Sequence, residues 1–268
     1  MSRFSPGMRI GDYRIDRELG TQESCVVYLC LHAVLPRQAA VKVMARGAEP
    51  ARATTTRVLR EAYLLESLSH PGIPRVFECA VLPDGRPWAA FERIEGTSLA
   101  ALIAGGPLAA AEVALMLRDV GDLLAHAHAR GVVHCRLTTD AIVRVTDRGA
   151  AVCVRHWDEA RAVDGEPRGA ADPRDDVHAL GAVMLHALAG AAPDLRAPPP
   201  AAERCPDAPV ELTSLIDQML ADDPSSRPPA DEVRDRARWL SDTFEPRMSD
   251  RLRWSAEPGG GRGGRSRP

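Results

Sequence analysis

Lysine is the residue type whose scarcity first points to chemistry in this sequence. Of the 34 basic side chains, 33 are arginine and one, Lys42, is lysine, and the chain contains no asparagine. A coding bias toward arginine, alanine, glycine and proline accounts for most of this imbalance. A lysine that persists against that bias indicates a position that needs a compact ammonium on a flexible stem. Lys42 is therefore the first candidate for a site that holds an anion.

Six cysteines are the other residues that could carry chemistry, as metal ligands or as disulfides. They are scattered, with no CxxC pair and no histidine at zinc-finger spacing, at Cys25, Cys30, Cys79, Cys135, Cys153 and Cys205. Cys25 and Cys30 flank a predicted strand and are expected to be reduced core residues. Free buried cysteine suits a reducing compartment, so we expect a cytoplasmic protein.

Composition limits the classes of protein to which the chain can belong. A length of 268 residues, 45% hydrophobic and 26% charged, is enough for one large or two small packed lobes. The net charge of −3 gives little support to binding of nucleic acid or of an anionic membrane. The most apolar segment, 177–193, carries two histidines and a central glycine and is expected to be a buried helix. The N-terminal segment lacks the apolar run of a secretory signal.

Strand patterns dominate the first ninety residues. Runs rich in valine, leucine and tyrosine predict strands over 13–19, 25–34, 38–44, 75–82 and 87–94. One helix is predicted between them, over Thr54–Ser69, because Val58, Ala62, Leu65 and Leu68 recur on one face.

Helical spacing takes over after Gly96. The predicted helices are Ala109–Arg130, Asp175–Ala189, Val210–Ala221 and Ala230–Leu240. A sheet-rich first half followed by a helical second half indicates an α+β arrangement of two lobes with a cleft between them. Such clefts commonly bind small ligands. The end of the chain is rich in glycine and arginine and is expected to be disordered.

The order of these segments resembles that of protein kinases, and of bacterial Ser/Thr kinases in particular, from about Ile10 to Leu240. The similar pieces are LGTQESCVVY (19–28), AAVKV (39–43), LREAYLLESLSHPGIPRV (59–76), FERIEGTSL (91–99), GVVHCRL (131–137), DDVHALGAVMLHALAG (175–190) and LIDQMLADDPSSRP (215–228). The resemblance implies a kinase-like domain over 10–241. Its N-lobe, 10–94, would be an antiparallel sheet with one main helix, and its C-lobe, 95–241, would be helical. Residues 242–268 would form the disordered tail.

The resemblance also implies an ATP site. Lys42 falls at the position that contacts the α- and β-phosphates, and Glu61 falls at the position that pairs with it. Of the glycines that cover the phosphates only Gly20 remains, because Gln22 and Cys25 occupy the other two positions. The adenine would lie among Val27, Ala40 and Val143, beside a gatekeeper and hinge formed by Phe91, Glu92, Arg93 and Ile94. Alternatively, Lys42 and Glu61 form only a salt bridge between elements of the fold.

The catalytic loop departs from the family pattern HRDLKPxN and has the sequence HCRLTTDA. His134 is kept, but the catalytic aspartate is Arg136, the phosphate-binding lysine is Thr138 and the metal-binding asparagine is Ala141. A guanidinium cannot accept the proton of a substrate hydroxyl. The resemblance therefore implies that no residue carries catalysis.

The metal-binding triplet is also changed, since His156 stands where the family has aspartate. Histidine is a poor ligand for Mg²⁺, which prefers oxygen. We expect Mg²⁺ to be absent or to bind in a non-standard way, and a shifted register offers Asp140 or Asp158 as substitute ligands. The segment 159–175 has no Ser, Thr or Tyr that could be phosphorylated, and no clear partner for Arg227.

The positions that pack the lobes together are better preserved. The resemblance implies a four-residue hydrophobic spine of Leu65, Val76, His134 and Trp157, anchored by Asp176. A preserved skeleton without catalytic groups predicts a pseudokinase that acts as a scaffold or regulatory module for a protein partner in a signalling pathway. Two alternatives remain open, a weak or unconventional ATP-dependent Ser/Thr kinase that uses Asp140 and Asp158, and a nucleotide sensor in which Arg136 replaces Mg²⁺ as countercharge.

Overall fold

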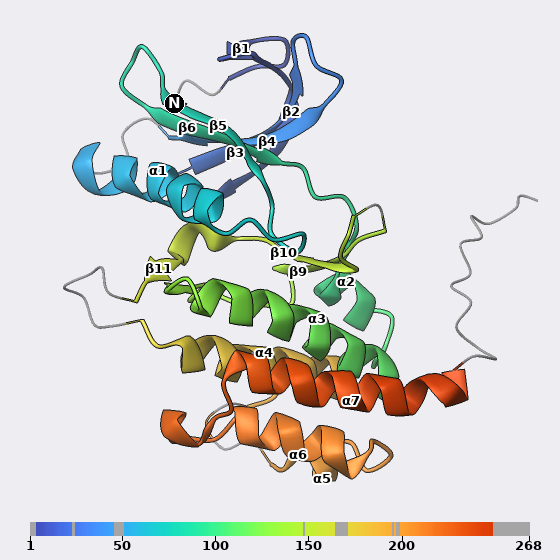
Figure 1. Cartoon of the computed structure of the whole chain (residues 1–268). Helices are drawn as coiled ribbons and strands as arrows, with labels where there is room; N and C mark the ends of the chain where they lie inside the picture. The colour runs from blue at the N-terminus through green and yellow to red at the C-terminus, as the bar shows by residue number, and fades with distance from the viewer. Residues whose placement is uncertain are drawn as a thin grey trace, which may run out of the picture.

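The computed structural model of the chain has two lobes, a sheet with one helix above and a stack of helices below (Figure 1). The structure describes residues 4–22, 25–45, 51–146, 148–163, 171–194, 196 and 199–248, with the backbone alone at 22, 51–57 and 244–248. The predicted α+β arrangement of a sheet-rich first half and a helical second half is confirmed. Among the described helices, none is both long and apolar enough to cross a membrane.

The upper lobe is built on one six-stranded antiparallel sheet in the order β1-β2-β3-β4-β6-β5. The bounds are β1 Arg9–Ile10, β2 Tyr13–Gln22, β3 Cys25–His32, β4 Gln38–Met44, β5 Val76–Val81 and β6 Pro87–Glu92. Helix α1, Ala51–Ser67, packs against β4, β5 and β6. Strand β4 is therefore covered on one face and paired along both edges, and Lys42 lies at its centre, in register with Val27 and Ala89.

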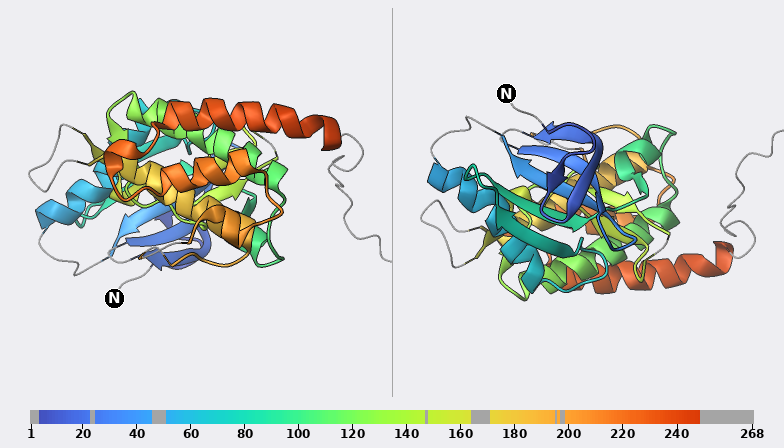
Figure 2. Two further views of the ribbon diagram at one scale, coloured as in Figure 1. Left: turned by 90° about the horizontal axis from the view of Figure 1, so that it is seen from below. Right: turned by 90° about the horizontal axis from the view of Figure 1, so that it is seen from above.

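The lower lobe packs its helices in layers around α3, which runs beside α7 (Figures 1 and 2). Its helices are α2 Leu99–Ile103, α3 Ala110–His128, α4 Pro173–Ala189, α5 Ala201–Arg204, α6 Val210–Met219 and α7 Ala230–Met248. Val113, Leu117, Val120 and Leu124 of α3 are fully buried, as their spacing predicted. Each such side chain contributes about 1.5–3 kcal/mol on burial, so α3 is the centre of this core.

Short strands and turns join the two lobes and carry the loops that the sequence singled out. Two small antiparallel sheets have the orders β10-β9-β7 and β11-β8. The bounds are β7 Thr97–Ser98, β8 Val132–Val133, β9 Ile142–Arg144, β10 Val152–Val154 and β11 Arg161–Ala162, with 3-10 turns η1 Trp157–Glu159 and η2 Pro224–Ser226. None of these short pieces was predicted, because two or three residues show no periodicity.

Several predicted boundaries are wrong. Helix α4 begins at Pro173, not at residue 175, because the Asp172 side chain accepts a hydrogen bond from the Arg174 amide and proline suits the first turn. Helix α1 lies over 51–67 instead of 54–69. Helix α7 continues to Met248, so residues 242–248 are helical and not part of a disordered tail. A helix that has begun gains one hydrogen bond for each added residue, even without an apolar face. Residues 249–268 lie outside the described part.

Gly96 connects the last strand of the upper lobe to the lower one and tolerates no side chain. Its φ is +155°, and a Cβ there would overlap the carbonyl oxygen of Arg144 and lie 2.9 Å from Val143 Cγ1.

We expect Gly96→Ala to lower the free energy of unfolding by about 2–4 kcal/mol. Urea denaturation followed by circular dichroism measures this. Gly149→Ala, whose nearest contact would be ordinary at 3.8 Å, should change stability by less than about 1 kcal/mol. Equal effects of the two variants would contradict this role of Gly96.

Candidate functional site

A cavity of about 460 Å³ lies between the lobes. It is lined by β2, β3, β4, α1, the segment after β6 and the residues that follow β10, namely Leu19, Gly20, Thr21, Val27, Ala40, Lys42, Glu61, Leu65, Pro74, Phe91, Glu92, Arg93, Ile94, Arg155, His156 and Trp157. Nine of the ten residues predicted to surround a nucleotide line this cavity. The exception is Val143, which is 1% exposed and packs with Val145 and Cys153 under Ile94. Ile94, also predicted, lines the cavity and packs against this cluster.

Lys42 and Glu61 form an ion pair at the inner end of the cavity. The Lys42 Nζ to Glu61 Oε2 distance is 2.6 Å, and the two residues are only 7% and 5% exposed. Burial raises the pKa of the Glu61 carboxyl, and the nearby Lys42 ammonium opposes that rise. Because strand β4 and helix α1 hold the two partners, the pair ties the helix to the sheet. Removing one member of such a pair leaves the other charge buried and uncompensated.

Glu92 lies on the opposite wall, but its carboxylate is engaged by arginines. Its Oε1 is 2.6 Å from Arg148 Nη1 and 3.3 Å from Arg75 Nη2, and its amide donates to the Arg75 carbonyl at 2.8 Å. Burial alone would raise the pKa of Glu92, but the hydrogen bonds from Arg148 and Arg75 outweigh it and lower the pKa. Glu92, which was predicted to contact a ligand, therefore stabilises the end of β6 through its ion pairs with the two arginines.

The carboxylate of Asp176, 1% exposed at the start of α4, holds the loop that follows β8. Its Oδ2 accepts a hydrogen bond from the His134 amide at 2.8 Å and lies 2.9 Å from His128 Nε2. Its Oδ1 accepts from the Cys135 amide at 2.8 Å, and Cys135 has a φ of +63°. A hydrogen bond from Asp176 near His134 was expected. In the structure Asp176 also contacts the Cys135 amide and the His128 side chain.

His134 is held as a neutral ring between the lobes. Its Nε2 lies 2.9 Å from the Arg155 carbonyl, which can only accept, and its Nδ1 accepts from the Arg136 amide at 3.2 Å. The ring meets Trp157 edge to face, with centroids 4.6 Å apart. Burial lowers the pKa of His134, and the negative charge of Asp176 opposes this. Leu65 and Trp157 are buried in one core, and Val76 packs against it, so the residues predicted to form the spine border the same core.

Three of the four replaced positions lie in the loop after β8, and one of them, Arg136, lies beside Asp158. The Arg136 side chain is 54% exposed, and its Nη1 lies 3.4 Å from Asp158 Oδ2. The other oxygen of Asp158, Oδ1, is buried and has no hydrogen-bond partner. The exposed Thr138 only accepts from the Ala141 amide at 3.3 Å, while Ala141 is fully buried. The position of the family's catalytic aspartate is therefore occupied by Arg136, which cannot take a proton from a substrate hydroxyl.

His156 and Arg155 follow β10 and line the cavity. His156 has a φ of +65°, and burial, with Arg155 as the next cause, lowers the pKa of its imidazole. Arg155 donates from Nη2 to the Asp140 carbonyl at 3.0 Å, and its Nε is buried without a partner. Arg155 was not predicted to line the site. The only signal in the sequence was its position directly before the replaced metal-binding triplet that begins at His156. Within the described ranges, no group of three or more histidine, cysteine, aspartate or glutamate side chains could hold a metal ion.

Arg227 finds a partner that the sequence analysis did not identify. The residue is 8% exposed, and its Nη1 lies 3.1 Å from Asp175 Oδ1 and 3.2 Å from the Arg174 carbonyl. Its Nε donates to the Ala221 carbonyl at 2.9 Å. The GEP segment, the expected trace of the family's usual partner, lies in 164–170, outside the described residues. Asp175 and main-chain carbonyls therefore satisfy this buried cation.

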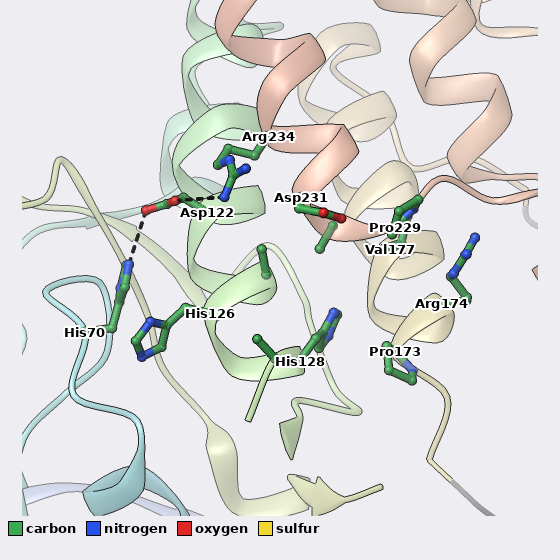
Figure 3. Close-up of a pocket in the computed structure, with 13 residues that line it drawn as sticks. His70, Asp122, His126, His128, Pro173, Arg174, Val177, Pro229, Asp231 and Arg234 are labelled. Carbon is green, nitrogen blue, oxygen red and sulfur yellow. Dashed lines mark hydrogen bonds and ion pairs between the residues drawn. The ribbon is translucent and has the colours of Figure 1, made fainter. Parts of the chain in front are cut away.

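A second cavity, of about 560 Å³, lies among α3 and the first turns of α4 and α7 (Figure 3). Three of its polar side chains form ion pairs with one another, while His126 Nε2 is buried without a hydrogen-bond partner. His70 Nε2 lies 3.3 Å from Asp122 Oδ2, and Arg234 Nη1 lies 3.7 Å from Asp122 Oδ1. None of the predicted site residues lines it. The cavity between the lobes is therefore the candidate site.

Substituting Asp176 should uncouple the loop from the helical core. Asp176→Ala leaves the His134 and Cys135 amides without their acceptor, and we expect the free energy of unfolding to fall by about 2–5 kcal/mol. Asp176→Asn, which retains one acceptor oxygen, should lose less. Urea titrations compare both with Asp207→Ala, a change at an exposed aspartate. If Asp176→Ala were no worse than Asp207→Ala, the anchoring role would be wrong.

The neutral His134 predicts a loss of stability in acid. Because burial lowers its pKa in the folded state, the unfolded chain binds more protons below about pH 6.5. Lowering the pH from about 7.5 to about 5.5 should cost up to about 1.4 kcal/mol for this one histidine. Urea titrations at both pH values should show a smaller pH effect in His134→Gln than in the native chain or in His186→Gln. An unchanged pH effect in His134→Gln would contradict the assignment.

Comparisons with known proteins agree with this geometry. Residues 13–239 match the family described as the protein kinase domain. Serine/threonine-protein kinase Pkn1 of Myxococcus xanthus is 30% identical over 257 residues, which cover 82% of this chain and 37% of that protein. Serine/threonine-protein kinase PrkC of Bacillus subtilis is 28% identical over 257 residues, 82% of this chain and 39% of that protein. The chain thus spans less than half the length of these relatives.

A solved structure shares the fold. The crystal structure of the PknI kinase domain of Mycobacterium tuberculosis aligns with a TM-score of 0.72 and 25% identity, covering 91% of this chain and all of that one. With a family match over most of the chain and the same two-lobed architecture, the chain belongs to the protein kinase family.

Proposed function

We propose that this chain is a pseudokinase, a protein kinase domain that binds a nucleotide and a protein partner but does not transfer phosphoryl groups at the rate of an active kinase. The observation that carries the proposal is Arg136. It occupies the position of the family's catalytic base, and its guanidinium points to Asp158 at 3.4 Å. A permanently protonated side chain cannot accept the hydroxyl proton of a substrate.

The residues present fit a nucleotide better than they fit its usual metal. A cavity of about 460 Å³ is in the range of small-molecule sites, and Lys42 lies on its wall. Protein kinases use ATP together with Mg²⁺, which is held by an aspartate and an asparagine. Here those positions are His156 and Ala141, and the remaining Asp158 faces an arginine. This donor set does not fit a hard cation that needs several oxygen ligands.

The preserved skeleton supports a role in binding. The Lys42–Glu61 pair fixes α1 on β4 within the upper lobe, and Asp176 fixes the loop after β8 within the lower lobe, without supplying chemistry. Such an arrangement can present one surface to a partner, and a bound nucleotide can stabilise it. The partner is a protein in a signalling pathway on this proposal. A reducing compartment such as the cytoplasm suits six cysteines that form no disulfide.

A second candidate function, a weak Ser/Thr kinase, is favoured by one specific observation. The buried Oδ1 of Asp158 has no hydrogen-bond partner, and the Lys42–Glu61 pair is formed. A rearrangement that exposed Asp158 would offer one carboxylate to a metal. The relatives named above are serine/threonine-protein kinases, which is compatible with this alternative.

Transfer of ³²P from ATP to generic protein substrates, with Mg²⁺ or Mn²⁺, tests the proposal. The native chain should show no transfer above that of Lys42→Ala. The combined reversion Arg136→Asp, Ala141→Asn and His156→Asp restores the base and the metal ligands, and should raise transfer on the order of 10²-fold or more. Adding Lys42→Ala to the reverted chain should abolish that gain.

Robust transfer by the native chain would refute the pseudokinase assignment. If that transfer also required metal and disappeared in Asp158→Ala, the second candidate would replace the first.

A further inference from the structure

Among the described residues, one cation of the interlobe cavity has no direct ion pair with a carboxylate. Lys42, the obvious cation, is held by Glu61 at 2.6 Å, and Arg136 lies beside Asp158. Arg93 pairs with Glu95 at 2.9 Å. Arg155 lines the same cavity, and among the described residues it forms no ion pair. The charge of Asp140 acts on it, but its contact with that residue is to the main-chain carbonyl.

The hydrogen bonds of Arg155 are also incomplete. One of its terminal nitrogens, Nη2, donates to the Asp140 carbonyl at 3.0 Å, while Nε is buried and has no partner. Burial lowers the pKa of Arg155, but a guanidinium remains charged in proteins. A buried charged donor without an acceptor is costly. An oxyanion in the cavity would supply the missing acceptor and a direct ion pair.

We propose that Arg155 binds the phosphate oxygens of a nucleoside di- or triphosphate, so that this cavity takes its nucleotide without a divalent cation. The planar guanidinium pairs well with phosphate oxygens and can carry part of the countercharge that Mg²⁺ supplies in an active kinase. The inference rests on the nucleotide binding proposed above. It assigns the countercharge that replaces Mg²⁺ to Arg155, whereas the sequence pointed to Arg136.

The position of the side chain leaves room for this ligand. The cavity volume of about 460 Å³ is what remains with Arg155 in place, so the arginine borders the space without filling it. Its bond to the Asp140 carbonyl holds the guanidinium at the wall, next to the loop that carries Arg136. Part of the ordering cost of the side chain is therefore met before any ligand binds.

Isothermal titration calorimetry of the chain with ATP, ADP and adenosine, each in EDTA and in Mg²⁺, tests the proposal. ATP and ADP should bind in EDTA with a Kd within about threefold of that in Mg²⁺. Arg155→Gln should weaken ATP and ADP by about tenfold or more, as expected for loss of a charge-assisted phosphate contact. Binding of adenosine should change by less than about threefold, because it has no phosphate. Arg174→Gln, on the wall of the second cavity (Figure 3), removes the same charge and should leave all three affinities unchanged.

Two outcomes for a folded protein would overturn the inference. Binding that requires Mg²⁺ and is lost in Asp158→Asn would assign the countercharge to a metal. ATP binding that is equal or tighter in Arg155→Gln would show that the arginine restricts the cavity instead. Absence of ATP binding in every condition, with cooperative unfolding intact, would also reject it. None of these results depends on phosphoryl transfer. Absence of ATP binding would also remove nucleotide binding from the proposed function, whereas the other two outcomes leave nucleotide binding in place.

Discussion

A buried carboxylate with three donors around it organises the lower half of the cleft. Asp176 accepts the amides of His134 and Cys135 and lies against His128, so it joins α4, α3 and the loop after β8 at one point. Because that carboxylate is removed from water, its hydrogen bonds have no competing solvent, and the loop cannot relax without leaving a charge unsatisfied. The rest follows from this constraint. His134 is oriented toward the Arg155 carbonyl and toward Trp157, and the segment that carries His156 is positioned in turn.

The cleft has an arginine, an alanine and a histidine where the family pattern has two aspartates and an asparagine. Where the family places acceptors for a metal and for a proton, this chain has Arg136, Ala141 and His156. The changes act together, since a site without metal ligands gains little from a base, and a site rich in cations needs no metal to attract phosphate. The Lys42–Glu61 pair survives in that setting because it also connects α1 to β4. On the proposal of a pseudokinase, the architecture is therefore retained without the chemistry.

Much of the fold could be predicted from periodicity. The apolar spacing of α3 and the paired strands of the upper lobe are determined by burial, which leaves a regular pattern in the sequence. The site could be predicted where a motif marks a position, as for Lys42 and Glu61. The site could not be predicted where a side chain contacts a residue that is distant in the sequence. Arg155 meets a carbonyl from another loop, Arg227 meets Asp175, and Ile94 covers Val143, and none of these contacts is periodic or local. The end of α7 was missed because helix propagation needs no apolar signal.

The position of Lys42 has a consequence for covalent labelling of the protein. The chain has one side-chain amine, and that amine is almost entirely buried at the centre of β4 and bonded to Glu61. Reagents that acylate surface lysines therefore find no lysine on the exterior of the protein. The arginine guanidinium groups on its surface are not modified by such reagents. A reactive acyl group carried into the interlobe cavity would meet a single lysine. Its modification would report access to the cavity without any background from other lysines.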